Sequence, residues 1–548
     1  MNHTSQIFQT QTKKRWTRVK WTSRIIGIVT VFLLFVTVLA VINATNPSLP
    51  EMNDRAKVYK AILNPNNKFS LSSVQNKKYK GFKYFLEKKQ IEDSVKRLTV
   101  SQNKTSLIRS AFYTPWNKAS LPDLIKNADK LNTVYPEWFF IDTITFKLQT
   151  RIDSAGLAII KKNNLSIQPI FNNFHTGKTA NERGFFDSKL LHVILSDTTR
   201  RNNIIGQISD TLIYYHLQGL NVDFEEINEK SNDPLTKFQQ QLFGVLHSRN
   251  LLVSMDVQAK NEDYDFKELS KYNDYVILMA YDEFNDATEA GPISSQKWIE
   301  EQLDWMDDKI DVSKIILGVA GYARDWITEG EGKRVEDITY AAAIDNAKLS
   351  RSAVTFDNSS YNLHYSYSEP KSDTSSETKH TIWLTDAATT FNILRFSDDY
   401  KTAGTALWHL GGKDPRIWKY YSRDLSTAAL QKTPFNFNTL AVIPIDPFSK
   451  PTATGEGELL NILYTPVVGK IKIELDTTGI LIAEQQYIQL PSGYVYEKFA
   501  EDKTQMGPGH KIILTFDDGP DPEYTPKILT ILEKEKIPPA TSTKVKMR

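Results

Sequence analysis

Eight short apolar runs alternate with amphipathic segments between about residues 105 and 425. The runs have the length of β-strands and include WFFIDT, GLNVDFE, YVILMAYD and GTALWHL. The segments between them, such as LPDLIKNADKL and DPLTKFQQQLFGVLHSR, repeat their apolar residues at helical spacing. Eight strands interleaved with helices over about 320 residues are typical of a (β/α)8 barrel. The pattern therefore predicts an α/β fold, a TIM barrel over residues 105–425.

Segments of different character interrupt and follow this pattern. Residues of about 324–380 are rich in Ser, Tyr and Asp and contain the strand-like stretches NLHYSYS and TIWLTD. They predict a small α+β insertion between the seventh and eighth strands. Residues 426–508 contain a Pro- and Gly-rich linker and then short apolar runs, which predict a small β module. Residues 509–548 begin a further unit.

The N-terminus carries a long apolar run. Ile25 to Ile42 are 18 residues without a charge, and about 27 Å of helix is close to the thickness of a bilayer core. Six basic residues precede the run, and no acidic residue occurs before Glu51. We therefore expect a single-pass helix at 25–43, a cytoplasmic basic tail at 1–24, a polar, Lys-rich stalk at 44–104 and an extracytoplasmic main domain. The alternative is a cleaved signal peptide, but the run is longer than such segments and lacks a small-residue cleavage site.

Composition narrows the functional classes. The formal net charge is only +2, so no basic field points to nucleic acid. The chain has no Cys, which excludes disulfides, a thiol nucleophile and Cys-based metal sites. Nothing in the sequence indicates an oligomeric state.

The run GLNVDFEE ends in three acidic residues. Side chains alternate along a strand, so Asn221, Asp223 and Glu225 share one face. In a (β/α)8 barrel the C-terminal ends of the strands form the functional face, which is where these residues fall. The alternative is a solvated strand end whose acids cap the next helix, a description that suits Glu226.

Four spaced motifs resemble glycoside hydrolase family 18, and the stretches AFYTPWNKASL and VYPEWFFID resemble the first strands of its bacterial cell-envelope branch. That family ends its fourth strand in DxxDxDxE, which residues 218–225 (QGLNVDFE) match in part. MAYD at 279–282 resembles the MxYD motif of the sixth strand. ILGVAGYARDW at 316–326 and GTALWHLGGKDPRIW at 404–418 resemble the seventh and eighth strands. The resemblance covers about residues 105–422 and implies a (β/α)8 barrel.

The resemblance implies substrate-assisted catalysis, an exception to the two-carboxylate rule of most glycosidases. Glu225 would be the general acid, and Asp223 would raise its pKa and orient the 2-acetamido group of the substrate, whose carbonyl oxygen attacks C1. Tyr281 would donate a hydrogen bond to the intermediate. The substrate-binding residues implied are Asn221, Met279, Asp282 and Trp408. No cofactor is expected for the barrel.

Two positions depart from the motif, because Gln218 and Asn221 stand where the family has Asp. Asn221 carries no charge, so we expect Asp223 to ionise more easily than in the family. The leading hypothesis is a hydrolase of β-linked N-acetylglucosamine polymers. The alternative is a non-hydrolytic glycan-binding barrel that serves a larger polysaccharide deacetylase and glycosyltransferase system, since a fold does not fix a function.

A second motif lies near the C-terminus. KIILTFDDGPDPEYTPKILTILE at 511–533 resembles the start of a polysaccharide deacetylase domain of carbohydrate esterase family 4. The resemblance makes Asp517 a general base and Asp518 a ligand of a divalent metal, which a complete domain also binds through two downstream His. No His follows Asp518 in this chain. We therefore expect a vestigial, truncated deacetylase segment without deacetylase activity.

Overall fold

The structure is a computed structural model and describes residues 24, 107–175, 184–230, 232–329, 332–370, 377–445, 452–457, 459–499 and 523–536. The chain divides into two compact units, Met1–Tyr59 and Lys60–Arg548, and every element below belongs to the second. Among the described residues no helix is long and apolar enough to cross a membrane. The expected membrane segment at 25–43, Asp517 and Asp518 lie outside the described residues.

Eight parallel strands form a closed barrel, as the sequence predicts. The ring closes because the first strand pairs with both the second and the last. The barrel strands are β1 (Ile108–Tyr113), β2 (Thr133–Ile141), β5 (Ile170–Asn172), β8 (Gly219–Asp223), β9 (Leu252–Val257), β10 (Tyr275–Met279), β11 (Ile315–Ala320) and β17 (Gly404–Trp408). Two short strands, β3 (Leu148–Thr150) and β4 (Ser166–Ile167), pair with β2. A separate hairpin joins β6 (Phe174–His175) to β7 (Phe185–Phe186).

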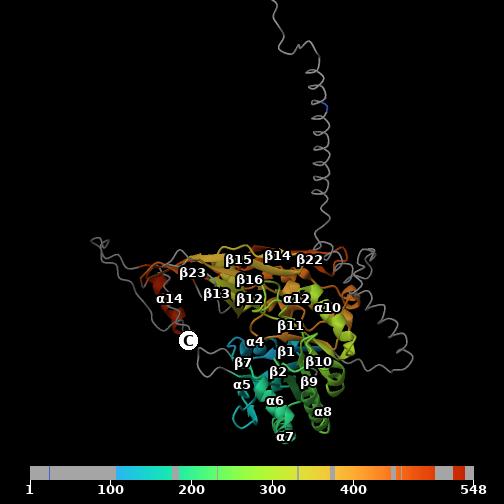
Figure 1. Cartoon of the computed structure of the whole chain (residues 1–548). Helices are drawn as coiled ribbons and strands as arrows, with labels where there is room; N and C mark the ends of the chain where they lie inside the picture. Colours follow the sequence, from blue (N-terminus) through green and yellow to red (C-terminus); the bar gives the residue numbers. More distant parts are fainter. Residues whose placement is uncertain are drawn as a thin grey trace, which may run out of the picture. The chain divides into compact units, whose positions relative to one another are not determined.

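Helices surround the barrel (Figure 1). Most begin at an Asp, Asn or Ser whose side chain accepts a hydrogen bond from the first turn, for example Asp153 and Asn232. The helices are α4 (Ser120–Asn127), α5 (Ser154–Lys162), α6 (Ser188–Ser196), α7 (Thr198–Tyr214), α8 (Asp233–His247), α9 (Phe266–Leu269), α10 (Gln296–Asp307) and α12 (Ala387–Tyr400). In α7 and α8, for example, buried residues repeat at helical spacing on one face, whereas α12 is buried on all sides.

Alternate side chains of the strands fill the inside of the barrel. One buried layer contains residues from six strands: Phe112, Tyr135, Ile170, Ile277, Ile316 and Ala406. The intervening side chains face the helices; Phe224, for example, packs against Phe171 and against Phe238 of α8. The interior is therefore a packed core, and Asp223 and Asp256 lie near the C-terminal ends of their strands.

An α+β insertion lies between β11 and α12. It contains β12 (Ala323–Glu329), β13 (Gly332–Ile338), α11 (Tyr340–Leu349), β14 (Thr355–Asp357), β15 (Asn362–Pro370) and β16 (Glu377–Leu384). The strands form one antiparallel sheet in the order β13-β12-β16-β15-β14. Its buried face, which includes Leu363 and Ile382, packs against α11. We call residues 323–384 the insertion.

The segment after the barrel forms two small sheets and one more helix. The first sheet contains β18 (Val442–Ile443), β21 (Gly469–Leu475) and β22 (Ile482–Gln489), and the second contains β19 (Thr452–Thr454), β20 (Leu459–Tyr464) and β23 (Val495–Phe499). The helix α14 spans Tyr524–Lys534. Ile443 and Ile471 of the first sheet join the apolar core of the insertion. The β18-β21-β22 sheet is therefore an extension of the insertion's core.

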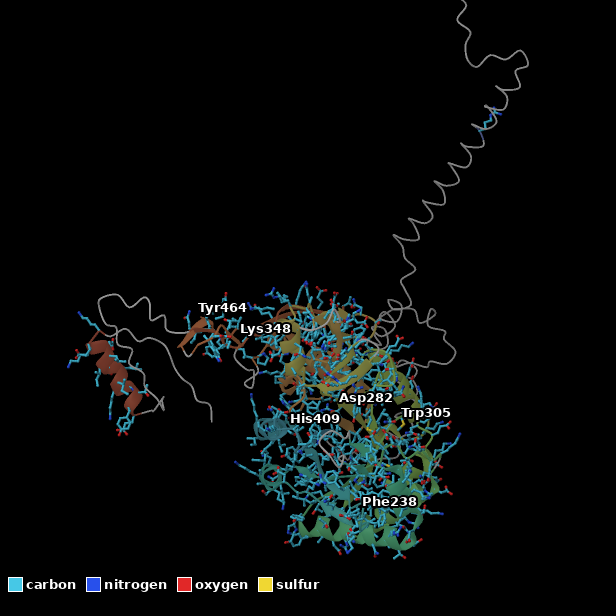
Figure 2. The ribbon with its side chains drawn as sticks, turned by 60° about the vertical axis from the view of Figure 1, so that its left-hand side comes forward. Phe238, Asp282, Trp305, Lys348, His409 and Tyr464 are labelled. Carbon is cyan, nitrogen blue, oxygen red and sulfur yellow. The ribbon has the colours of Figure 1, made fainter. Side chains whose placement is uncertain are left out.

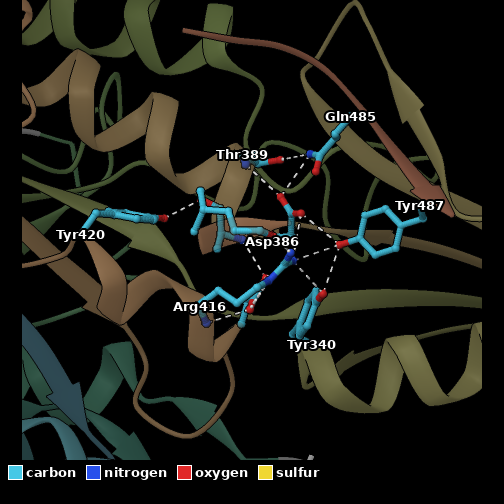
Figure 3. Close-up of polar contacts among 10 residues, drawn as sticks. Tyr340, Asp386, Thr389, Arg416, Tyr420, Gln485 and Tyr487 are labelled. Atoms are coloured by element: carbon cyan, nitrogen blue, oxygen red, sulfur yellow. Dashed lines mark hydrogen bonds and ion pairs between the residues drawn. The ribbon is translucent and has the colours of Figure 1, made fainter. Parts of the chain in front are cut away.

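A buried polar network ties this sheet to α12 (Figure 3). Asp386 caps the N-terminus of α12 and accepts hydrogen bonds from Tyr487 and Gln485 of β22. Arg416 pairs with Asp386 at 3.3 Å and with Asp414 at 2.5 Å. Nearly every polar group of this network has a partner, as buried groups require.

Candidate active site

The acidic residues at the end of β8 lie at the C-terminal end of the barrel. Asp223 closes β8 and is 7% exposed, and its Oδ1 atom has no hydrogen-bond partner among the described residues. Glu225 follows two residues later and is half-buried. Asn173 holds the backbone of Glu225 from both sides, because its Nδ2 donates to the Glu225 carbonyl at 3.0 Å and its Oδ1 accepts from the Glu225 N–H at 3.1 Å. Local geometry therefore fixes Glu225 beside Asp223.

Burial and repulsion from neighbouring carboxylates raise the pKa values of these two acids. Burial raises the pKa of Asp223 to about 7, and the charge of Glu137 adds to the effect. Burial also raises the pKa of Glu225 well above its ordinary value, and the charge of Asp223 contributes. The carboxyl of Glu225 has one weak partner, the Gln258 amide at 3.3 Å. Glu225 thus keeps its proton to a higher pH than an exposed carboxyl does, which suits a general acid.

The neutral Asn221 does not leave Asp223 with an ordinary pKa, because burial and a carboxylate from another strand raise it. That Asp223 ionises more easily than in the family stays a prediction. Both ends of the Asn221 amide are hydrogen-bonded to the neighbouring strand β9. Its Nδ2 donates to Asp256 at 2.7 Å, and its Oδ1 accepts from Ser254 at 2.8 Å. Asn221 therefore belongs to a buried polar cluster inside the barrel.

The side chain of Gln218 hydrogen-bonds to backbone groups near the start of β8. Its side-chain oxygen accepts from the backbone N–H of Ile167 at 2.9 Å, and its amide donates to the carbonyl of His216 at 2.9 Å. It precedes β8, at the opposite end of the strand from Asp223. The first departure from the family motif consequently lies away from the acidic residues.

The insertion holds Asp282 in place. Asp282 accepts a hydrogen bond from the hydroxyl of Tyr322 and pairs with Arg324 of β12 at 2.8 Å. Arg324 is buried and also pairs with Asp337 of β13 at 2.6 Å. Asp282 therefore lies where the barrel meets the insertion (Figure 2). The positive charge of Arg324 opposes the increase in the pKa of Asp282 that burial causes.

Three further side chains at this end of the barrel are apolar or aromatic: Tyr281, Met279 and Trp408. The Tyr281 ring contacts Tyr322 edge-on at 6.4 Å, and Trp408 contacts Phe112 of the inner layer edge-on at 5.1 Å. Met279 is buried and pairs in register with Gly318. A Cβ atom on Gly318 would lie 2.8 Å from the Leu278 carbonyl and 3.2 Å from the Tyr281 ring, so only glycine leaves room for Tyr281.

Sequence reasoning missed two acids of the site, Asp256 and Glu137. Asp256 lies on β9, and burial and the charge of Asp223 raise its pKa well above its ordinary value. The stretch SMDV near the end of a strand was the available sign. Glu137 lies on β2 and accepts from Asn172 at 3.3 Å and from the indole of Trp116 at 2.5 Å. Among the described residues, no group of three or more His, Asp or Glu could hold a metal ion.

Comparison with known proteins identifies related families for two parts of the chain. Residues 184–413 match the model described as glycosyl hydrolases family 18, and residues 504–542 match the model described as polysaccharide deacetylase. Both resemblances drawn from the sequence are thus confirmed. The curated relative "Uncharacterized glycosylase YvbX" of Bacillus subtilis is 24% identical over 56% of this chain and 88% of its own length. "Putative sporulation-specific glycosylase YdhD" of the same bacterium is 25% identical over 43% of this chain and 57% of its own length.

Solved structures resemble the barrel. A chitinase from Chromobacterium violaceum has a TM-score of 0.51 and 20% identity, with 59% of this chain and 100% of that chain covered. The Bacillus cereus spore cortex-lytic enzyme SleL has a TM-score of 0.51 and 20% identity, with 58% and 74% covered. At these identities the likeness shows the shared fold.

Proposed function

We propose that this chain, whose residues 184–413 match the model of glycosyl hydrolases family 18, cleaves β-linked N-acetylglucosamine-containing polysaccharide by substrate-assisted, retaining catalysis. The observation that carries the proposal is the pair at the end of β8. Glu225 is half-buried with a raised pKa, directly beside the buried Asp223. A proton donor and a second carboxyl on one strand face are what this mechanism requires.

In the proposed mechanism Glu225 donates its proton to the oxygen of the scissile glycosidic bond. The C1–O bond breaks while the carbonyl oxygen of the substrate's own 2-acetamido group bonds to C1 from the opposite face. Asp223 orients that group and compensates the positive charge that develops on it. Tyr281 donates a hydrogen bond to the cyclic intermediate, Asp282 and Met279 contact the sugar, and Trp408 lies beneath the ring. Water then attacks C1 with Glu225 as base, so the anomeric configuration is retained.

The names of the relatives support a polysaccharide substrate. They are named as glycosylases, a chitinase and a spore cortex-lytic enzyme. We propose a chitin-like polymer, an exopolysaccharide or peptidoglycan, all of which carry the 2-acetamido group that the mechanism uses. Asn221 departs from the family motif and its amide is hydrogen-bonded to Asp256. This departure favours the second candidate function, a barrel that binds such glycans without cleaving them.

Oligomers that differ only at the 2-amino group test the reaction class. The full chain is incubated with N-acetylglucosamine oligomers and with the same oligomers carrying free amines, and products are separated by chromatography. We expect cleavage of the acetylated series and at least about 10²-fold slower cleavage of the free amines, because an amine has no carbonyl oxygen to attack C1. Equal cleavage of both series would contradict substrate assistance. Binding without any cleavage would establish the glycan-binding alternative.

We also propose that residues 25–43 anchor the protein in a membrane, with the barrel outside the cytoplasm. The uncharged run and the basic residues before it support this placement. The full chain should sediment with membranes and resist extraction by carbonate at high pH, whereas a chain without residues 1–43 should be released. Release of the full chain by carbonate, or recovery of a product shortened near residue 44, would contradict an uncleaved anchor.

A further inference from the structure

The register of three neighbouring strands places Glu137 one layer below Asp223, near the C-terminal end of the barrel. In the parallel pairing of β2, β5 and β8, Ile170 of β5 pairs with both Glu137 and Asn221, so these residues share the inner face of the barrel. Two residues further on, Asn172 pairs with Asp223. The Asn172 amide also donates to Glu137 at 3.3 Å, which brings the Glu137 carboxylate up to the level of Asp223.

Two hydrogen bonds fix the Glu137 carboxylate, one on each oxygen. Asn172 donates to Oε1, and the indole N–H of Trp116 donates to Oε2 at 2.5 Å. Trp116 itself is 63% exposed and contacts the ring of His409 edge-on at 5.1 Å. Glu137 therefore has a single orientation, between a surface aromatic ring and the buried acids.

Asp223 is the only charged residue of β8. Asn221 is neutral, and both ends of its amide are bound by Asp256 and Ser254. No Lys, Arg or His of the described residues makes an ion pair with Glu137 or Asp223. Glu137 is thus placed to act on Asp223 through its charge alone.

We propose that Glu137 is a positioning residue. Its carboxylate supplies the second negative charge near Asp223 that the neutral Asn221 does not supply, and this charge controls the pH at which Asp223 becomes ionised and can orient a substrate. This role in catalysis rests on the proposed hydrolysis. The electrostatic coupling between Glu137 and Asp223 does not rest on it, and can be measured in a protein without substrate.

The charges around the pair support this assignment. Burial is the largest cause of the raised pKa of Asp223, and the charge of Glu137 is the next. Burial also raises the pKa of Glu137, whereas Trp116 and Asn172 oppose the increase. The other titratable or charged groups that interact with a member of the pair are Arg151, Glu225, Asp256, Tyr264 and Tyr281. Behind them, Tyr135 interacts with Asp256, and Asp282 interacts with Glu225.

A double-mutant cycle on thermal stability tests the coupling. The full-length wild type, Glu137→Gln, Asp223→Asn and the double variant are melted at pH 4 and pH 8. An acid whose pKa is raised on folding binds its proton in the native state, so the native state loses stability as pH rises from about 4 through about 7. Removing the charge of Glu137 should therefore raise Tm at pH 8, by about 3 °C.

The cycle separates coupling from a local effect. The gain from Glu137→Gln at pH 8 should fall by at least half when Asp223→Asn is present, and at pH 4 the two backgrounds should agree. An equal effect in both backgrounds at pH 8 would overturn the proposal.

If Glu137→Gln does not fold, Trp116→Phe replaces it. This variant removes a hydrogen bond that favours the charged Glu137, so Tm should fall more at pH 8 than at pH 4; a loss that does not depend on pH overturns the proposal.

Activity gives the second readout. Glu137→Gln should move the acid limb of the kcat profile down by about one pH unit, because Asp223 ionises earlier without a neighbouring charge. The basic limb should stay in place. A changed KM with both limbs unmoved would reduce Glu137 to a support for Trp116 and overturn the proposal. If the wild type cleaves no substrate, the proposed hydrolysis fails, while the stability cycle still decides the role of Glu137.

Discussion

Glu225→Gln should lower kcat on N-acetylglucosamine oligomers by roughly 10³-fold while the protein stays folded. The amide keeps the size of the side chain and its contact with Gln258 but has no acidic proton for the leaving oxygen. Because the charged form of Glu225 is disfavoured by burial and by Asp223, Tm of the variant should be unchanged or higher near pH 8. Initial rates on labelled oligomers, with melting curves beside them, give both values.

Glu226→Gln is the matched control. Glu226 is exposed and adjoins Glu225 in the chain, so kcat should stay within about twofold. A Glu225→Gln variant that retains more than a tenth of the activity would mean that another group protonates the leaving oxygen. Asp256 would then be the next acid to replace, since its pKa is also raised by burial.

Arg416→Met should lower the free energy of unfolding by about 3–5 kcal/mol, the largest stability effect that we expect. Arg416 is almost fully buried and pairs with Asp414 and Asp386. It also donates to the Leu440 carbonyl at 2.5 Å. Methionine fills similar volume but leaves two buried carboxylates without a cation. Urea unfolding, followed by circular dichroism and by tryptophan fluorescence, measures the loss.

Arg334→Met is the control for this prediction. Arg334 pairs with Glu336 at 2.7 Å, but both side chains are exposed. Exposed pairs contribute about 0–1 kcal/mol, so the control should unfold close to the wild type. If the two variants differ by less than about 1 kcal/mol, the Arg416 network does not hold β22 on α12. The β18-β21-β22 sheet should also become more accessible to proteases in Arg416→Met, because Tyr487 of β22 hydrogen-bonds the same Asp386.

The barrel and the central pair of the site were predictable because both depend on patterns along a single stretch of chain. Alternating apolar runs and helical segments predicted eight strands, and the structure closes them into a ring. The two-residue alternation at the end of β8 placed Asp223 and Glu225 on one face, since side-chain direction in a strand follows from position alone. The motifs around Met279 and Trp408 likewise placed those residues at strand ends.

Pairing between strands decided the rest. A sequence pattern gives the face of a side chain but not the register of the neighbouring strand, so it could not show that Asp256 binds Asn221 or that Glu137 reaches the level of Asp223. The same limit hid Arg324, which comes from the insertion to hold Asp282. The charges that set the ionisation of Asp223 therefore could not be found from its own strand. By itself the sequence determined which residues face the end of the barrel. Only the tertiary structure decided which charges stand together there, because desolvation and repulsion act through space between strands that are far apart in the chain.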